Sequence, residues 1–380
     1  MAPYIATTVI STLLVYIEER LPKRFNKRKW LSLLSIIILC VLAGARDNTV
    51  GTDTLVYGES LFTWVHNNDL STAFLMNTRI QIERGYMLFI YIISRFTDQV
   101  FWNYFFIEFV CAYFTYKALD DAEIGKNKWI GVFLYNVLFY SFTMNLMRQC
   151  MAMAIVLFGF KYVRENKFWK YLITCLIAFM FHSSAIIGIS IYFLYKICGL
   201  GNSGKQFSFK KFFKKYKFLF IGITIIASAF IVIFSRQLML FVVIFKPSYA
   251  GQIAWAHNYN PAIAMLVLML VLVLPLLISI KWIIRINPHF TFYLLVMIMS
   301  VILWQLAGVS SQTFRITLYY WYLIILIIPE LVHAIKSHRK KLSFSAYYVV
   351  FGSFYYWFVF VYSLMNYTYP YTSKLLGISP

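Results

Sequence analysis

Long runs of apolar residues, separated by short polar stretches, dominate the chain. A membrane-spanning helix needs about 20 mainly apolar residues, and fewer where the crossing is short or tilted. The pattern predicts an all-α, polytopic transmembrane bundle of about twelve crossings. The predicted spans are residues 3–17, 30–45, 101–118, 129–144, 146–162, 170–181, 183–197, 218–236, 262–282, 290–308, 316–335 and 345–366. Tight turns are expected at residue 145 and at residue 182, where two predicted spans almost adjoin.

The loops between these runs predict the direction of each crossing. Cytoplasmic loops carry an excess of Lys and Arg, whereas acidic residues contribute little to the bias. We therefore place loop 117–128 in the cytoplasm, although its lysines are interspersed with acidic residues. The loops assigned to the cytoplasm on their basic residues are 18–29, 161–170, 199–217, 281–289 and 335–342.

The run Tyr86–Phe96 conflicts with this topology if it crosses the membrane. Counting it would move either loop 18–29 or loop 161–170 outside, and the run is only about half as long as a crossing requires. We predict a re-entrant or interfacial helix on the outer face, within an outer loop over residues 46–100 that holds short amphipathic helices. Twelve crossings with both termini outside then satisfy every basic loop, and residues 1–380 form a single integral membrane domain.

Composition supports a lipid environment and excludes a nucleic-acid partner. Apolar residues make up 61% of the chain and charged residues 13%, against roughly 45–50% and 25% in soluble domains. The net charge of +21 comes from short clusters between apolar runs, with no continuous basic face. The five cysteines are dispersed, without the spacing of a disulfide framework or metal site. No basic segment precedes the first run, which is therefore expected to remain a span.

Charged and polar residues near the membrane are costly, so each unusual one is a candidate for function. On the predicted topology they fall into groups that all reach the outer face, although they were not used to choose the orientation. These groups are Arg46, Asp47 and Asp53; Glu83, Arg84, Gly85 and Tyr86; Asn145, Arg148 and Gln149; His182, Ser183 and Ser184; and Gln312 and Arg315. Their shared face predicts a catalytic site there.

Each residue also has a purely structural interpretation. Glu83 could cap a helix N-terminus, Arg148 could extend to the interface, and His182 could be a packing residue. Arg315 could anchor the chain at the interface, and Arg46 with Asp53 could begin a solvated loop. None of these interpretations explains why all the groups share one face.

The residue types suggest binding of a phosphate-linked sugar. Guanidinium groups bind phosphate or pyrophosphate through paired donors, and carboxylates or imidazole can remove a proton from a hydroxyl. The arginines are Arg46, Arg148 and Arg315, and the candidate bases are Asp53, Glu83 and His182. Sugar rings could stack on aromatic side chains, namely Tyr57, Tyr86, Tyr319, Tyr320 and Trp321.

Several catalytic motifs are absent from the sequence. It contains no His-Glu-x-x-His helix, Walker loop or nucleophile elbow, and no Asp-x-Asp signature of a metal-bound nucleotide sugar. We therefore expect neither a metal cofactor nor a soluble nucleotide-sugar donor, and a phosphate-linked substrate presented from the outer leaflet fits better.

Four short motifs, in order, resemble the EpsG family of Wzy-type polysaccharide polymerases. They are Arg46-x-x-x-Val50-Gly51-Thr52-Asp53-Thr54-x-x-Tyr57, Glu83-x-Gly85-Tyr86, Asn145-x-Met147-Arg148-Gln149 and Phe181-His182-x-Ser184-Ala185. The order and approximate spacing match to about residue 200. Beyond that, the resemblance depends mainly on Arg315 before Tyr319. Cys150 departs from the small residue expected after the third motif, but cysteine is itself small.

The resemblance implies that the protein joins lipid-linked oligosaccharide repeat units into O-antigen, capsule or exopolysaccharide, with an architecture similar to the GT-C-like glycosyltransferases that use lipid-linked sugars. The growing chain on undecaprenyl pyrophosphate would be the donor, and another undecaprenyl-linked unit the acceptor. Implied partners are a Wzz-type chain-length regulator and a flippase, in a bacterial inner membrane with the site facing outward.

The resemblance also suggests roles for the site residues. Arg148, with Gln149 and with Arg46 or Arg315 as candidate additions, would bind the donor pyrophosphate, and Asn145 is a further substrate-binding candidate. His182 or Asp53 would activate the acceptor hydroxyl, and Glu83 would orient a sugar or a basic partner. Tyr57 and Tyr86 would contact sugar.

Three other classes of membrane protein remain as alternatives. A flippase or another transporter should place its charges near the bilayer midplane. An O-antigen ligase would use the same donor chemistry with lipid A as acceptor, and a membrane acyltransferase could use a single His near one face.

Overall fold

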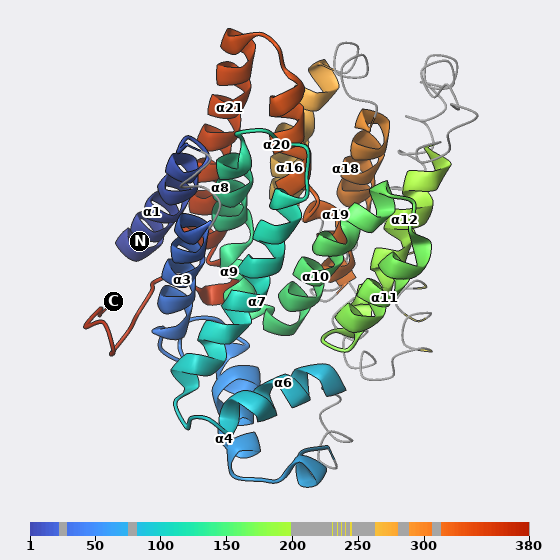
Figure 1. The fold of residues 1–380 in the computed structure, drawn as a ribbon. Helices are drawn as coiled ribbons and strands as arrows, with labels where there is room; N and C mark the ends of the chain where they lie inside the picture. Colours follow the sequence, from blue (N-terminus) through green and yellow to red (C-terminus); the bar gives the residue numbers. More distant parts are fainter. Residues whose placement is uncertain are drawn as a thin grey trace. The chain divides into compact units, whose positions relative to one another are not determined.

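The computed structural model describes residues 1–22, 29–74, 82–198, 263–279, 289–305 and 313–379, with isolated positions between 230 and 244. These residues are mainly helical, and the β-bridge among them joins Ser373 to Ile378 (Figure 1). The predicted all-α class is confirmed for this part of the chain, while the number of crossings stays a prediction. The predicted span 218–236, the basic loop 199–217 and Gln312 lie outside the described residues, apart from Phe230 and Phe234 within that span.

The chain forms two compact units, Met1–Ile189 with Ile325–Pro380, and Ser190–Ile324. The first unit contains most of the predicted outer-face groups. Its helices, including two that continue across the unit boundary, are α1 (Ala2–Glu18), α3 (Trp30–Gly44), η1 (Thr54–Ser60), α4 (Leu61–His66), α6 (Arg84–Ser94), α7 (Val100–Asp120), α8 (Lys128–Leu138), α9 (Tyr140–Asn145), α10 (Met147–Arg164), α11 (Phe168–Phe179), η2 (Ser183–Ile187), α12 (Gly188–Ile197), α20 (Ile324–Ala334), α21 (His338–Tyr356), η6 (Trp357–Tyr362) and η7 (Met365–Tyr367).

The second unit takes in most of α12 and further apolar helices. These are α16 (Ile263–Ile278), α18 (Phe290–Trp304), η5 (Thr313–Ile316) and α19 (Thr317–Trp321). Within this unit, α18 packs against α16 and α19. Arg315 lies on η5 and therefore belongs to this second unit.

Helix α7 lies at the centre of the first unit, where it packs against α3 and α10. Helix α1 packs against α3 and α8, and α21 also packs against α8. The predicted span 129–144 is divided at Phe139 into α8 and α9, and only Leu146 separates α9 from α10. The expected tight turn is therefore present, and it brings the ends of α7, α9 and α10 together.

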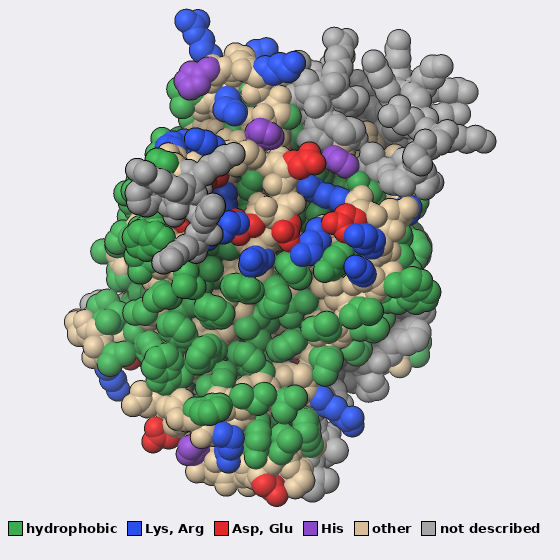
Figure 2. Space-filling view, viewed as in Figure 1, with side chains coloured by type: hydrophobic (Ala, Val, Ile, Leu, Met, Phe, Trp, Pro, Cys, Tyr) green, Lys and Arg blue, Asp and Glu red, His purple; other side chains and the backbone are tan. Residues whose placement is uncertain are grey.

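The outward surface of α1, α3 and α7 is strongly apolar. Ile5, Val9 and Leu13 on α1 remain about half exposed, as do comparable side chains on α3. Figure 2 shows a band of hydrophobic side chains on this face, with charged side chains above and below it. Among the described residues, Phe314–Ala334 and His338–Tyr362 are long and apolar enough to cross a membrane, and eight further apolar helical stretches are shorter. An exposed band of this kind is the surface that lipid covers.

The short helix α6 lies across the end of α7 and packs against α4 and α7 (Figure 1). Its 11 residues span about 16 Å, roughly half the hydrocarbon thickness of a bilayer. It is therefore too short to cross by itself, and its re-entrant or interfacial placement on the outer face stays a prediction.

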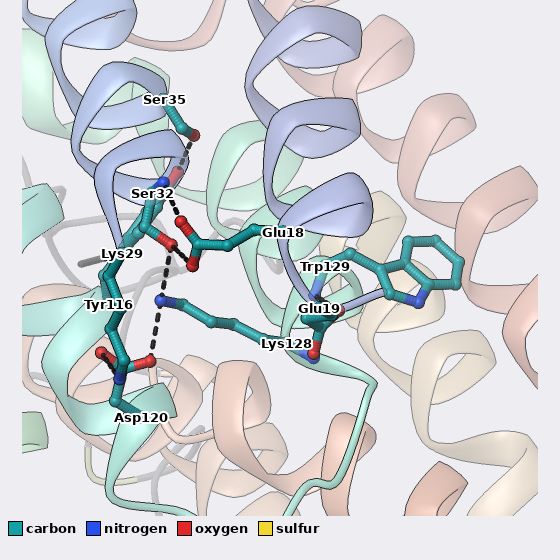
Figure 3. Close-up of polar contacts among 9 residues, drawn as sticks. All are labelled: Glu18, Glu19, Lys29, Ser32, Ser35, Tyr116, Asp120, Lys128 and Trp129. Atoms are coloured by element: carbon teal, nitrogen blue, oxygen red, sulfur yellow. Dashed lines mark hydrogen bonds and ion pairs between the residues drawn. The ribbon is translucent and has the colours of Figure 1, made fainter. Parts of the chain in front are cut away.

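The opposite end of the unit, where α1 ends and α3 and α8 begin, is joined by a polar network (Figure 3). Both Glu18 carboxylate oxygens accept hydrogen bonds from Ser32, at the first turn of α3. Lys128 donates to Ser32 and forms an ion pair with Asp120 at 2.8 Å. Glu19 accepts the backbone N–H of Lys128 at 2.6 Å, at the start of α8. Carboxylates are favoured at helix N-termini, so this network fixes how α1, α3 and α8 meet at this end of the unit.

Glu19 makes the stability of this end depend on pH. Burial raises its pKa to about 7, against the opposing effect of the Lys128 and Trp129 N–H groups. The folded state therefore holds this proton more tightly than the unfolded chain. Stability should fall by roughly 3 kcal/mol as the pH rises from about 4.5 to about 7, and should then level off. Thermal unfolding in detergent would measure this fall, and Glu19→Gln should remove most of it. An equal fall in both proteins would contradict the assignment.

Candidate functional site

Arg148 and Glu83 form an ion pair at the end of the unit opposite the basic network. Arg148 Nη1 lies 2.6 Å from Glu83 Oε2, and both side chains are largely buried. Arg148 is the second residue of α10, and Glu83 is the N-cap residue of α6. The guanidinium also stacks over the ring of Tyr57, 4.4 Å from its centroid. The carboxylate and the ring together hold the guanidinium in one orientation.

The other oxygen of Glu83 extends the contact to the His182 segment. Glu83 Oε1 accepts the Ser183 N–H at 2.9 Å. Burial would raise the pKa of Glu83, but the charges of Arg148 and His182 and the Ser183 N–H outweigh it and hold that pKa below its ordinary value. Glu83 is therefore ionised at neutral pH, with each oxygen bonded. This arrangement suits a residue that positions Arg148 better than one that removes a proton.

His182 is held by its own turn. Its Nδ1 accepts the Ser184 N–H at 3.3 Å and lies 2.6 Å from Ser184 Oγ. Because Nδ1 accepts a proton donor, the neutral imidazole carries its hydrogen on Nε2. In that form, Nε2 is a hydrogen-bond donor.

Gly85 allows the α6 and His182 segments to approach each other closely. The N–H of Gly85 donates to Met180 O at 2.9 Å, and a Cβ on Gly85 would lie 2.6 Å from that same oxygen. Since backbone cannot move aside cheaply, any side chain here would push Glu83 away from Ser183.

Gly85→Ala should destabilise the protein by roughly 1–3 kcal/mol through overpacking and should also reduce its activity. Unfolding temperature and product formation would be measured together. Gly377→Ala is the control, because a Cβ there meets no atom within 4 Å and the positive φ is its only strain. Equal losses in the two variants would show that the close approach is unimportant.

The first motif folds against the turn between α9 and α10. Gly51 has a φ of +97°, and a Cβ there would lie 3.1 Å from Met144 O. Asn145 Oδ1 accepts two hydrogen bonds, from the Thr52 hydroxyl and from the Asp53 N–H, each at 2.9 Å. Asn145 thus fixes the position of Asp53, the N-cap residue of the π-helical segment η1, which contains Tyr57.

Arg46 is a second, more deeply buried arginine at this turn. It is 6% exposed and donates to Ala43 O at 2.7 Å and Met144 O at 3.2 Å. The guanidinium lies 3.9 Å from the Tyr104 ring centroid. It forms no ion pair within the described part of the chain, and its Nε has no hydrogen-bond partner there. A buried cation without a carboxylate partner favours an anionic or strongly polar ligand.

Both arginines lie at the α9–α10 turn: Arg46 donates to Met144 O on α9, and Arg148 is in the first turn of α10. The Tyr86 hydroxyl is within electrostatic reach of Arg148, Arg46 and Asp53, and it donates to Tyr57 O at 3.3 Å. The structure therefore gathers Arg46, Asp53, Tyr57, Glu83, Tyr86, Asn145, Arg148 and His182 at one end of the first unit. Gln149 is buried beside them on α10. Arg315, Tyr319, Tyr320 and Trp321 belong to the second unit.

A pocket of about 670 Å³ opens above Arg46. Its polar lining includes Asp47, Asn48 and Glu59, and its aromatic lining includes Trp102 and Tyr104. The C-terminal tail closes one side: Lys374 lines the pocket and donates its N–H to Asp47 Oδ1 at 2.9 Å. Hydrogen-bonding groups beside aromatic faces are well suited to a sugar.

Sequence reasoning missed Glu108, a carboxylate buried in the middle of α7. It accepts the Tyr135 hydroxyl and the Thr143 hydroxyl, each at 2.5 Å. Both donors are neutral, and they join α7 to α8 and α9 just below the site. A lone acidic residue in the apolar run 101–118 was the available signal, because such residues are costly in a membrane.

The sequence model of the EpsG family matches residues 29–373, nearly the whole chain. No curated protein and no solved structure matches it. The matched range contains all the motifs at Arg46, Glu83, Arg148 and His182. It also extends past residue 200, where the motifs alone gave a weaker resemblance. The resemblance inferred from the sequence motifs is therefore confirmed.

Proposed function

The chain belongs to the EpsG family of Wzy-type polymerases, and on this premise we propose that it joins lipid-linked oligosaccharide repeat units into a polysaccharide. The family and the apolar helices identify a membrane protein of polysaccharide biosynthesis. Under the proposal, the reaction occurs at the outer face of a bacterial inner membrane. Donor and acceptor are both undecaprenyl-pyrophosphate-linked.

The fixed guanidinium of Arg148 is the observation that carries this proposal. Among the described residues, Glu83 uses one N–H of Arg148 and Tyr57 covers its face, which leaves the other N–H groups of Arg148 for a phosphate. A guanidinium held in this way can stabilise the charge that develops on a leaving pyrophosphate without reorganising during the reaction. Arg46, which donates to Met144 O at the same turn, adds a second positive charge to this end of the first unit.

In the proposed reaction, a hydroxyl oxygen on the terminal sugar of the acceptor attacks the anomeric carbon of the donor. The new glycosidic C–O bond forms while the bond between that carbon and the pyrophosphate oxygen breaks. The electron pair of the broken bond stays on the pyrophosphate, next to Arg148. The hydroxyl proton passes to a base on the protein, and undecaprenyl pyrophosphate leaves.

Asp53 is our choice for that base. His182 uses Nδ1 as an acceptor for Ser184, so its neutral ring offers an N–H rather than a free lone pair. It suits a donor to the leaving phosphate oxygen. Asp53 is half-buried, its backbone is fixed by Asn145, and it lies near the Tyr86 hydroxyl.

Reconstitution of the full-length protein with one purified undecaprenyl-pyrophosphate-linked repeat unit tests the function. A ladder of lipid-linked oligomers on a gel is the expected product. Transfer of the unit to lipid A, without a ladder, would identify a ligase. Movement of the unit across vesicles without any new glycosidic bond would identify a flippase, and either result would overturn the proposal.

A further inference from the structure

An apolar groove runs between α6 and α7, beside the pocket above Arg46. Its cavity measures about 410 Å³, and its lining is apolar apart from Thr97. The residues that form it are Phe89, Ile92, Ile93, Phe96, Trp102 and Phe106. Several of them are open to the outside: Phe96 is 85% exposed and Ile92 51% exposed. Apolar surface of this kind needs an apolar partner.

The groove connects the polar parts of the site. At one end, Trp102 lines both the groove and the pocket that contains Arg46, Asn48 and Glu59. At the other end, the Phe89 ring packs edge-on against Phe181, which directly precedes His182. Helix α6 itself begins at the Glu83–Arg148 pair. An extended apolar chain in the groove would therefore present a polar head group to the side chains described above.

We propose that this groove holds the isoprenoid chain of the lipid-linked substrate, with the adjoining pocket receiving its sugar portion. The proposal rests on the proposed function for the identity of the lipid. Figure 2 shows hydrophobic side chains continuing from the apolar band onto the end formed by α4 and α6. A substrate could thus enter from the bilayer and keep its chain in apolar contact while its head group reaches the arginines.

Binding of radiolabelled undecaprenyl phosphate to the full-length protein in nanodiscs tests the groove without requiring turnover. Ile92→Asn should weaken this binding about tenfold, because it places an amide against the isoprenoid chain. Leu88→Asn is the matched control, since Leu88 is also exposed on α6 but does not line the groove. Phe106→Asn and Tyr113→Asn form the corresponding pair on α7. Only the groove variants should lose affinity.

Equal weakening by the groove and control variants, or unchanged binding by Ile92→Asn and Phe106→Asn, would overturn the proposal. The proposal would also be overturned if dioleoyl phosphatidic acid bound as tightly as undecaprenyl phosphate and lost as much affinity in the groove variants. That result would identify a surface for bulk lipid. A reconstituted protein that forms no ladder, yet binds undecaprenyl phosphate through the groove, would count against the polymerase function alone.

Discussion

Replacing Arg148 with alanine is expected to slow polymerisation by about 10³-fold, because it removes the fixed cation beside the leaving pyrophosphate. The ladder formed from a purified repeat unit would measure the rate. Arg148→Lys should recover only part of the activity, since an ammonium group lacks the planar fork that binds phosphate through paired donors. Arg84→Ala is the matched control, because Arg84 is exposed and adjacent to Glu83. It should retain activity close to that of the unmodified protein.

Loss of Arg148 also leaves Glu83 partly buried without its cation, which could unfold the site by itself. The double variant Glu83→Gln with Arg148→Ala separates the two effects. It should recover most of the thermal stability lost in Arg148→Ala but none of the activity. If the double variant polymerised at a normal rate, the arginine would serve only to neutralise Glu83.

Asp53→Asn is expected to lower the rate by about 10²–10⁴-fold, because the amide cannot accept the acceptor's hydroxyl proton. The fold should survive, because Asp53 donates to Asn145 through its backbone N–H, which the substitution keeps. Measured against pH, the variant's residual rate should lose the acidic limb that ionisation of a catalytic carboxylate produces. Asp98→Asn, at an exposed position in the same outer loop, should behave like the unmodified protein.

His182→Gln distinguishes the two candidate bases. If His182 donates to the leaving group, its replacement should lower the rate while the acidic limb remains. If His182→Gln loses all activity while Asp53→Asn remains active, the two roles are reversed, and His182 is the base.

The local pattern of the sequence was sufficient for the helical class and for the shortness of α6. Both depend on the length and apolarity of single segments, which are properties of neighbouring residues. The four motifs were sufficient for the family, which the match over residues 29–373 confirms. The grouping of Arg46, Glu83, Arg148 and His182 at one end also followed from counting helices that alternate in direction.

Only the tertiary structure decided which of these residues meet. Glu83 and Arg148 are 65 positions apart, and Asp53 and Asn145 are 92 apart, so their contacts depend on how α6 and η1 pack against the α9–α10 turn. The same packing turned Glu83 from a candidate base into the partner of Arg148 and revealed Glu108 within α7. It also showed the groove beside Trp102. Spacing along the chain cannot specify such contacts, because each is formed by side chains from helices that meet only in the folded protein.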